Sequence, residues 1–140
     1  MMIRWLYKQL WHIAPLFIRC YLKKRAEKST SYLEHWDERF GKKMSNPLQH
    51  PIWIHAVSVG ETRAAQPLIE ALQNHFPDAP LLLTQMTPTG RHTAQTLYPN
   101  AQCRYIPYDK PEWVGQFLTD HAPRFGILME TEIWPNLMHM

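Results

Sequence analysis

Three carboxylates in the sequence are placed where they could take part in proton transfer. Glu61 opens a predicted helix just after a short turn, where the positive end of the helix dipole favours an ionised carboxylate. Such a group could accept a proton from a substrate hydroxyl, although a first-turn glutamate can equally serve only to stabilise its helix. Glu130 and Glu132 follow a predicted strand. Because alternate residues at a strand end point in opposite directions, only one of this pair is expected to face a common cleft.

Further polar residues follow apolar runs at equivalent places along the chain. These polar segments are residues 58–62, 85–91, 107–109 and 130–132. If the apolar runs are parallel strands, their carboxyl ends meet at one edge of a sheet, which is where such sheets bind ligands. We therefore predict that the polar segments converge on one site. For Thr87 and Asp109, capping of the helix that follows is an equally good explanation.

The elements that would position these groups form a repeated strand and helix pattern. Apolar runs begin near residues 52, 81, 103 and 125, and a helical pattern follows each of them. Pro88, Pro111 and Pro135 stand where the first helical residue would be, a position at which proline is favoured. Pro67 implies that the first helix starts late or bends. This alternation predicts an α/β fold with a parallel sheet and helices on both faces, occupying residues 51–140.

The first 28 residues combine aromatic and basic side chains. They contain seven basic residues and one acidic residue, so they carry a net charge of +6, whereas the whole chain carries +3. No uncharged run approaches the roughly 20 residues that a membrane-spanning helix needs. We expect one amphipathic helix over residues 3–22 that lies on an anionic membrane surface, although packing against the domain or against a missing partner is the alternative. Residues 29–50 are polar and predict a connector with one short helix.

The composition excludes several classes of protein. A length of 140 residues suits one folded unit, and the localised positive charge argues against a nucleic-acid-binding face. Only two cysteines occur, without metal-like spacing, so neither a disulfide framework nor a zinc site is predicted, and a reducing cytoplasm fits. The glycine series of dinucleotide-binding turns and of P-loops is missing. We expect no metal and no cofactor.

Four blocks of the sequence closely resemble, in order and spacing, the signature stretches of bacterial 3-deoxy-D-manno-octulosonic acid (Kdo) transferases. The blocks are HAVSVGET at residues 55–62, TQMTPTG at 84–90, PYD at 107–109 and METEIWPN at 129–136. The stretch WDERFG at residues 36–41 and the aromatic-basic start also match, so the resemblance extends over nearly the whole chain.

This resemblance implies the amino-terminal half of a GT-B glycosyltransferase, in which two Rossmann-like domains face each other across a cleft. The implied activity is inverting, metal-independent transfer of Kdo from CMP-Kdo to a lipid A precursor (lipid IVA), at the cytoplasmic face of the inner membrane. Glu61 matches the family's general base, and Glu130 and Glu132 match a second acidic motif with a supporting role. The remaining residues expected to bind the acceptor or its phosphates are Ser58, Gly60, Arg63, Thr87, Thr89 and Arg91.

Members of that family continue well beyond the WPN motif, so we expect this chain to be the acceptor-binding part without the donor-binding domain, and inactive alone. The alternative is a non-catalytic, membrane-associated module that binds the acceptor. A flavodoxin-like or response-regulator domain is disfavoured, because flavin loops and clustered phospho-acceptor aspartates are missing. Sequence beyond Met140 would separate the first two possibilities.

Overall fold

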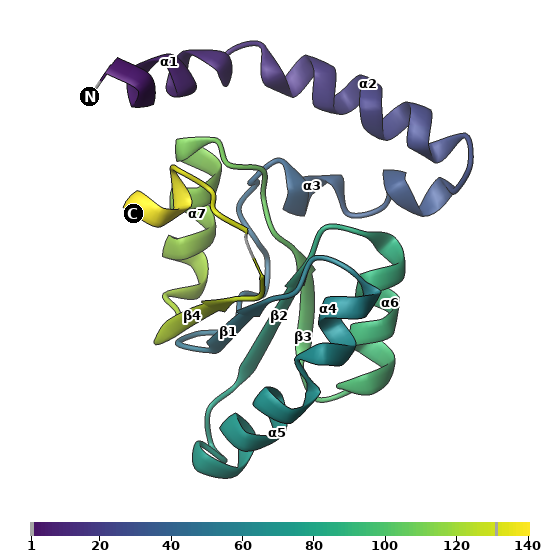
Figure 1. The fold of residues 1–140 in the computed structure, drawn as a ribbon, viewed down its shortest axis with the longest axis vertical. Helices are drawn as coiled ribbons and strands as arrows, with labels where there is room; N and C mark the ends of the chain where they lie inside the picture. The colour runs from purple at the N-terminus through teal and green to yellow at the C-terminus, as the bar shows by residue number, and fades with distance from the viewer. Residues whose placement is uncertain (1, 131) are drawn as a thin grey trace.

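A computed structural model of the protein describes residues 2–130 and 132–140, and a four-stranded sheet forms its centre (Figure 1). The strands are β1 (Ile52–His55), β2 (Leu81–Gln85), β3 (Gln102–Tyr105) and β4 (Phe125–Leu128). Their spatial order is β3-β2-β1-β4, and each neighbouring pair is parallel. The predicted α/β fold with a parallel sheet is confirmed.

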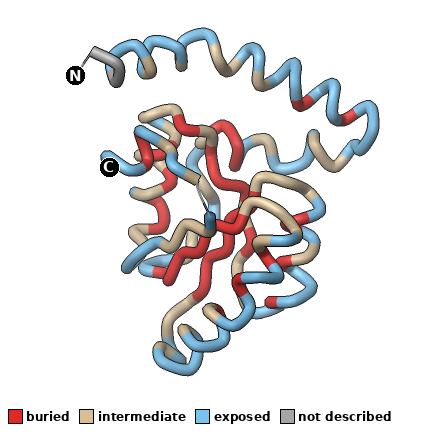
Figure 2. Tube along the Cα trace, in the orientation of Figure 1, coloured by how far each residue is buried: buried red, intermediate tan, exposed pale blue. Residues whose placement is uncertain are grey.

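Helices cover both faces of the sheet (Figure 1). On one face lie α4 (Val59–Ala64), α5 (Gln66–His75) and α6 (Pro88–Leu97), and on the other lies α7 (Pro111–His121). Side chains alternate along each strand, so Ile52 and Ile54 pack with Ile69 of α5, whereas Trp53 packs with Phe117 of α7. The two faces therefore have separate apolar cores, with β1 and β2 buried between them (Figure 2).

Prolines mark where most of the helices begin. Pro88 and Pro111 are the first residues of α6 and α7, as predicted. Pro67 stands in the first turn of α5, because the segment after β1 forms two helices that meet at Ala65 instead of one. The chain thus keeps Pro67 at a helix start, where its missing N–H is not needed.

The predicted helix after Pro135 is wrong for the residues described. Only a 3-10 turn, η2 (Leu137–His139), forms there. The backbone amides of Asn136 and Leu137 donate to the carboxylate of Asp109, each at 2.9 Å, so a long-range contact shapes this turn.

The leading segment is helical, but it is not the single helix predicted for residues 3–22. It consists of α1 (Met2–Leu10) and α2 (Ala14–Ala26), separated by a turn. Pro15 lies in the first turn of α2 and cannot donate the backbone hydrogen bond that a continuous helix would need, which explains the break. We refer to residues 2–26, which comprise α1, α2 and the turn between them, as the arm. The arm extends across the carboxyl edge of the sheet (Figure 1).

Residues between the arm and β1 pack against the body. They include η1 (Thr30–Leu33) and the short helix α3 (Trp36–Arg39). Glu38, Arg39 and Phe40 are all buried, which is unusual for two adjacent charged side chains. The segment predicted as a connector therefore contributes buried groups beside β3.

Candidate functional site

The order of the strands marks one place on the sheet as a ligand site. From β1 the chain moves outward to β2 and β3, and then returns to place β4 on the other side of β1. Sheets of this kind bind ligands at the carboxyl ends of the two strands where the order reverses, here β1 and β4. These ends stay paired as far as the hydrogen bond from the Met129 amide to the His55 carbonyl, at 2.9 Å. The turn after β1 carries Ser58, Gly60 and Glu61, and Glu130 and Glu132 follow β4.

Glu61 lies in the first turn of α4 and its carboxylate is held by two donors. The Val57 amide donates to Oε2 at 2.7 Å, and the Ser58 hydroxyl donates to Oε1 at 3.1 Å. The carboxylate therefore bridges the turn ahead of its own helix, close to the arrangement of a capping box. An ionised carboxylate has about four acceptor positions, so each oxygen keeps capacity for one more proton donor. Its helix-stabilising contacts and a role in accepting a proton are compatible.

The turns after β1 and β2 are tied together beside Glu61. The Val57 carbonyl accepts from the amides of Met86 and Thr87 at 3.1 and 3.3 Å. Thr87 caps α6 by accepting from the Gly90 amide at 3.0 Å, as the sequence suggested. A side chain at Gly90 would come within 2.8 Å of the Thr87 hydroxyl and 3.1 Å of the Val57 carbonyl, so glycine permits this close approach.

Gly60 differs from Gly90. A Cβ placed on Gly60 would have no described heavy atom within 4 Å, and the residue is exposed. Packing among the residues that the structure describes therefore does not require glycine at position 60. The open space lies above the same turn that holds Glu61.

Asp109 holds the 136–137 turn, which follows the acidic segment after β4. Besides the two amides of the 136–137 turn, the Asp109 backbone carbonyl accepts from the Asn136 side chain at 2.6 Å. Asp109 does not cap α7, so that explanation of this residue is wrong. Glu132 accepts from the indole of Trp134 at 2.6 Å, whereas Glu130 is exposed and adopts a left-handed backbone conformation (φ 60°).

The other predicted acceptor residues differ in their exposure to solvent. Thr89 is exposed in the first turn of α6, and Arg63 is exposed on α4. Arg91 is buried instead, and both of its terminal nitrogens donate to Glu38. Arg91 therefore forms a structural ion pair, whatever else it binds.

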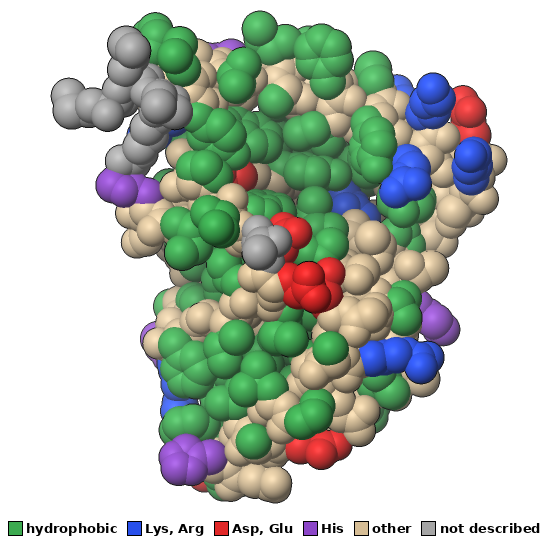
Figure 3. All heavy atoms as spheres, in the orientation of Figure 1, with side chains coloured by type: hydrophobic (Ala, Val, Ile, Leu, Met, Phe, Trp, Pro, Cys, Tyr) green, Lys and Arg blue, Asp and Glu red, His purple; other side chains and the backbone are tan. Residues whose placement is uncertain are grey.

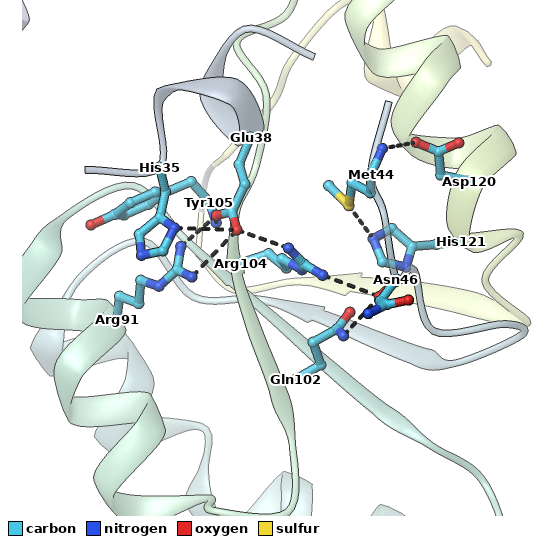
Figure 4. A network of polar contacts seen from close by, with 10 residues as sticks. All are labelled: His35, Glu38, Met44, Asn46, Arg91, Gln102, Arg104, Tyr105, Asp120 and His121. Carbon is cyan, nitrogen blue, oxygen red and sulfur yellow. Dashed lines mark hydrogen bonds and ion pairs between the residues drawn. The ribbon is translucent and has the colours of Figure 1, made fainter. Parts of the chain in front are cut away.

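Glu38 is the centre of a polar network that the sequence did not reveal (Figure 4). Its carboxylate accepts from Arg91, from Arg104 at 3.1 Å and from the Tyr105 amide at 2.8 Å. Burial alone would raise the pKa of Glu38, but these donors outweigh burial and hold the pKa below its usual value. Glu38 belongs to the WDERFG stretch that matches the family. Its hydrogen-bond donors could not be predicted, because they lie more than 50 positions away in the sequence.

The arm contacts the same edge of the sheet through aromatic residues. The Tyr7 hydroxyl donates to the Asp109 carboxylate at 2.8 Å, and Trp11 packs edge-on against Trp113 at 6.2 Å. Burial, together with the hydrogen bond and the negative charge of Asp109, raises the pKa of Tyr7 to about 12. Asp109 thus links the arm to the turn that follows Glu130 and Glu132.

His55, the last residue of β1, has a structural environment. Burial lowers its pKa to about 4, so the ring is neutral at physiological pH, and Nδ1 lies 2.9 Å from the Thr84 hydroxyl. Within residues 2–130 and 132–140, no group of three or more His, Cys, Asp or Glu side chains is arranged to hold a metal ion.

Sequence comparisons relate this site to known proteins. The profile of the family described as 3-deoxy-D-manno-octulosonic-acid transferase (kdotransferase) matches residues 34–140. The chain is 43% identical over 136 residues to the 3-deoxy-D-manno-octulosonic acid transferase of Bordetella pertussis, covering 90% of this chain and 31% of that protein. It is 36% identical over 141 residues to the Haemophilus influenzae transferase, covering 99% of this chain and 33% of that protein.

A more distant relative is the probable mitochondrial 3-deoxy-D-manno-octulosonic acid transferase of Arabidopsis thaliana, 31% identical over 95% of this chain and 30% of that protein. The chain spans about a third of the length of these curated relatives. The matched residues include the turns after β1, β2 and β4 that form the candidate site. The chain belongs to the Kdo transferase family.

Proposed function

We propose that this chain forms the acceptor-binding part of an enzyme that transfers Kdo from CMP-Kdo to a lipid A precursor (lipid IVA). The observation that carries the proposal is Glu61, a carboxylate oriented by the Val57 amide and the Ser58 hydroxyl at the point where the strand order reverses. Family membership supports Kdo transfer as the reaction, and the position of Glu61 supports its role as the base.

In the proposed reaction, Glu61 accepts the proton of an acceptor hydroxyl while the hydroxyl oxygen attacks the anomeric carbon of Kdo. CMP leaves from the opposite side, which inverts the anomeric configuration, and no metal ion takes part. Ser58 keeps Glu61 in position, and the open space at Gly60 leaves room for the acceptor sugar. Glu130 and Glu132, which follow β4, support the acceptor on one side of β1. Thr87 and Thr89, which follow β2, support it on the other side.

We further propose that the arm holds the enzyme on the cytoplasmic face of the inner membrane. Large apolar side chains of the arm are exposed, among them Leu16 at 64% and Phe17 at 72%. Basic side chains gather at the end of α2, and apolar ones are exposed along the arm (Figure 3). Among the described residues, no helix combines the length and apolar character needed to span a bilayer. A surface-bound arm beside the candidate site suits an acceptor that itself resides in the membrane.

The test is Kdo transfer to lipid IVA by a transferase whose first 140 residues are this chain, carrying Glu61→Gln. Glutamine keeps the size of the side chain but accepts protons poorly, so kcat should fall about 100-fold or more. The KM for the lipid should change little. The matched control is Glu70→Gln, an exposed glutamate on α5, which should leave both constants unchanged. A rise in KM with normal kcat would make Glu61 a binding residue instead of the base.

A further inference from the structure

The arm turns one face toward the rest of the chain. The least exposed residues of the arm include Tyr7, Trp11, Ile18, Leu22 and Ala26, whose separations are four or seven positions. This spacing keeps side chains on one face of a helix, and here it continues across the break between α1 and α2. Both helices of the arm therefore present the same docking face to the sheet and its loops.

Tyr7 makes the polar contact of this docking face. Its hydroxyl donates to Oδ2 of Asp109 at 2.8 Å, and Asp109 is only 4% exposed. Among the side chains that the structure describes, Tyr7 is the only one of the arm that hydrogen-bonds to a residue outside the arm. A hydrogen bond to a buried carboxylate is stronger than one between neutral groups at the surface, so this single contact is important for the docking of α1.

Asp109 is shared between the arm and the stretch that follows β4. Its carboxylate also accepts from the backbone amides of Asn136 and Leu137, each at 2.9 Å. Trp134, two positions before Asn136, donates to Glu132 at 2.6 Å. A short series of contacts thus connects Tyr7 on the arm with the stretch that carries Glu132, at the carboxyl edge of the sheet.

Apolar packing between α1 and this stretch is incomplete. A hollow of about 180 Å³ remains at their junction, with Tyr7 and Trp11 among its lining residues on the arm and Ile133 and Trp134 on the other side. Side chains that border an unfilled space lose part of their dispersion contacts. The position of α1 therefore depends on the Tyr7 hydrogen bond and on the edge-on contact between Trp11 and Trp113.

We propose that Tyr7 is a positioning residue for the acceptor, because its hydrogen bond to Asp109 fixes the arm relative to the acceptor site. The proposal rests on the proposed function, in which the arm binds the membrane and the acceptor resides there. The turn before Pro15 separates α1 from α2, so α1 can shift on its own when the hydrogen bond is lost. A fixed arm sets the depth and angle at which a membrane-bound sugar meets the site, and such positioning contributes to the rate.

The substitution Tyr7→Phe tests this role, because it removes the hydroxyl and keeps the ring that packs edge-on against Trp11. With lipid IVA in anionic vesicles and a transferase that contains this chain, the KM for the lipid should rise about threefold to tenfold while kcat stays unchanged. The control is Tyr21→Phe, the same change at a 53% exposed position of the arm. It should alter neither constant, and an unchanged KM in Tyr7→Phe would overturn the proposal.

Two further measurements separate positioning from anchoring and from a general structural role. Flotation of Tyr7→Phe with anionic vesicles should equal that of the unmodified protein, because phenylalanine is at least as apolar as tyrosine. The KM for an acceptor from which the acyl chains have been removed should not change, since a soluble acceptor does not depend on the arm. Weaker flotation, or an equal rise in KM for both acceptors, would exclude a positioning role.

The docking of α1 can be measured without any Kdo transfer. A spin label is attached at Lys8→Cys on the exposed side of α1, in residues 1–140 with Cys20→Ser, whereas Cys103 is buried and should not react. Adding Tyr7→Phe should shift the equilibrium from docked to mobile label about tenfold, the effect of one lost hydrogen bond to a carboxylate. Adding Tyr21→Phe should produce no shift.

The combined results identify which statement fails. Unchanged label mobility in Tyr7→Phe would show that the hydrogen bond does not hold α1, which overturns the proposal. Higher mobility with an unchanged KM for lipid IVA would mean that the bond holds the arm without positioning the acceptor, which also overturns it. Failure of Glu61→Gln to lower kcat would contradict the proposed function and leave the mobility result standing.

Discussion

Glu61 shows why the role of a single residue is difficult to assign from sequence. Its spacing after Ser58 is that of a helix cap, and the structure confirms that the carboxylate stabilises the turn through Ser58 and Val57. The same contacts fix the direction of the carboxylate at the ligand edge of the sheet. A residue can therefore stabilise its helix and remain available for proton transfer, so the two explanations do not compete.

Gly60 and Gly90 offer a matched pair of substitutions that separates function from packing. Gly60→Ala should leave stability unchanged or raise it by up to about 1 kcal/mol, because alanine favours a helix and nothing described lies nearby. It should lower Kdo transfer about tenfold or more by filling the space proposed for the acceptor. Gly90→Ala should instead destabilise the fold by about 1–3 kcal/mol through its contacts with Thr87 and Val57.

Thermal unfolding and Kdo transfer by both variants check this pair. Normal transfer by Gly60→Ala would contradict an acceptor position above that residue.

Replacing Glu38 should reduce stability in a pH-dependent way. Glu38→Gln leaves Arg91 and Arg104 without their carboxylate and should cost about 3 kcal/mol at neutral pH. Because the pKa of Glu38 is lowered in the folded protein, its stabilisation is present above the usual value of 4.5 and is lost as pH falls below it. The free energy of unfolding, measured in urea, should therefore fall less between pH 7 and pH 3 in the variant than in the unmodified chain.

The control for this experiment is Asp37→Asn, next in the sequence. Asp37 is 71% exposed and pairs with Lys42 at 2.6 Å, so its loss should change stability by less than about 0.5 kcal/mol. Similar losses in both variants would mean that burial of the Glu38 network contributes little.

At the scale of elements, the arm combines contacts to the body with exposed apolar side chains. It contacts the body through Tyr7, Trp11 and Arg19, the last of which stacks on Phe40 at 5.1 Å. Leu22 is buried, but seven other large apolar side chains of the arm are exposed: Trp5, Leu6, Leu10, Ile13, Leu16, Phe17 and Tyr21. Helices with this combination of apolar and basic groups bind membrane surfaces, and the binding weakens with salt.

Vesicle flotation tests the arm directly. The double variant Leu16→Ser and Phe17→Ser should reduce binding to anionic vesicles about tenfold or more, because it removes two exposed apolar side chains from the proposed contact. Removal of residues 1–28 should abolish binding. Leu97→Ser, on α6 away from the arm, is the control and should bind as the unmodified chain does. Binding that is independent of anionic lipid, of salt or of the arm would exclude the proposal.

At the scale of the whole molecule, the described residues form one parallel sheet, and the candidate site lies at its carboxyl edge. Strand β4 is an edge strand, with Phe125 and Gly126 exposed beside an apolar hollow of about 700 Å³. Holding both substrates in the reactive geometry contributes much of the rate enhancement in a transfer of this kind. The relatives are about three times as long as the matched region, so we propose that the donor is bound by a domain equivalent to their remaining length.

Residues 1–140 alone should therefore form no Kdo-lipid product from CMP-Kdo and lipid IVA, even if they bind the acceptor as proposed. They should also aggregate readily through β4 and its apolar surroundings. The measurement is CMP release and product formation by the purified chain, compared with its Glu61→Gln variant. Turnover above that variant would mean that donor contacts lie within these residues or that copies of the chain assemble a complete site.

The sequence alone determined the features that depend on neighbouring residues. The alternation of strands and helices, the helix starts at Pro88 and Pro111, and the cap formed by Thr87 were all readable because local sterics and local hydrogen bonds decide them. Convergence of the polar turns followed from the parallel sheet that this alternation requires.

Only the tertiary structure decided the features that depend on distant partners. The turn after Pro135 is governed by Asp109, 27 positions earlier, and Glu38 finds its donors 53 to 67 positions away. The strand order β3-β2-β1-β4, which places the carboxyl end of β4 beside that of β1, is also one of several that the same alternation allows. These contacts form only when the folded chain brings remote segments together, because a local pattern contains no information about which distant groups will meet.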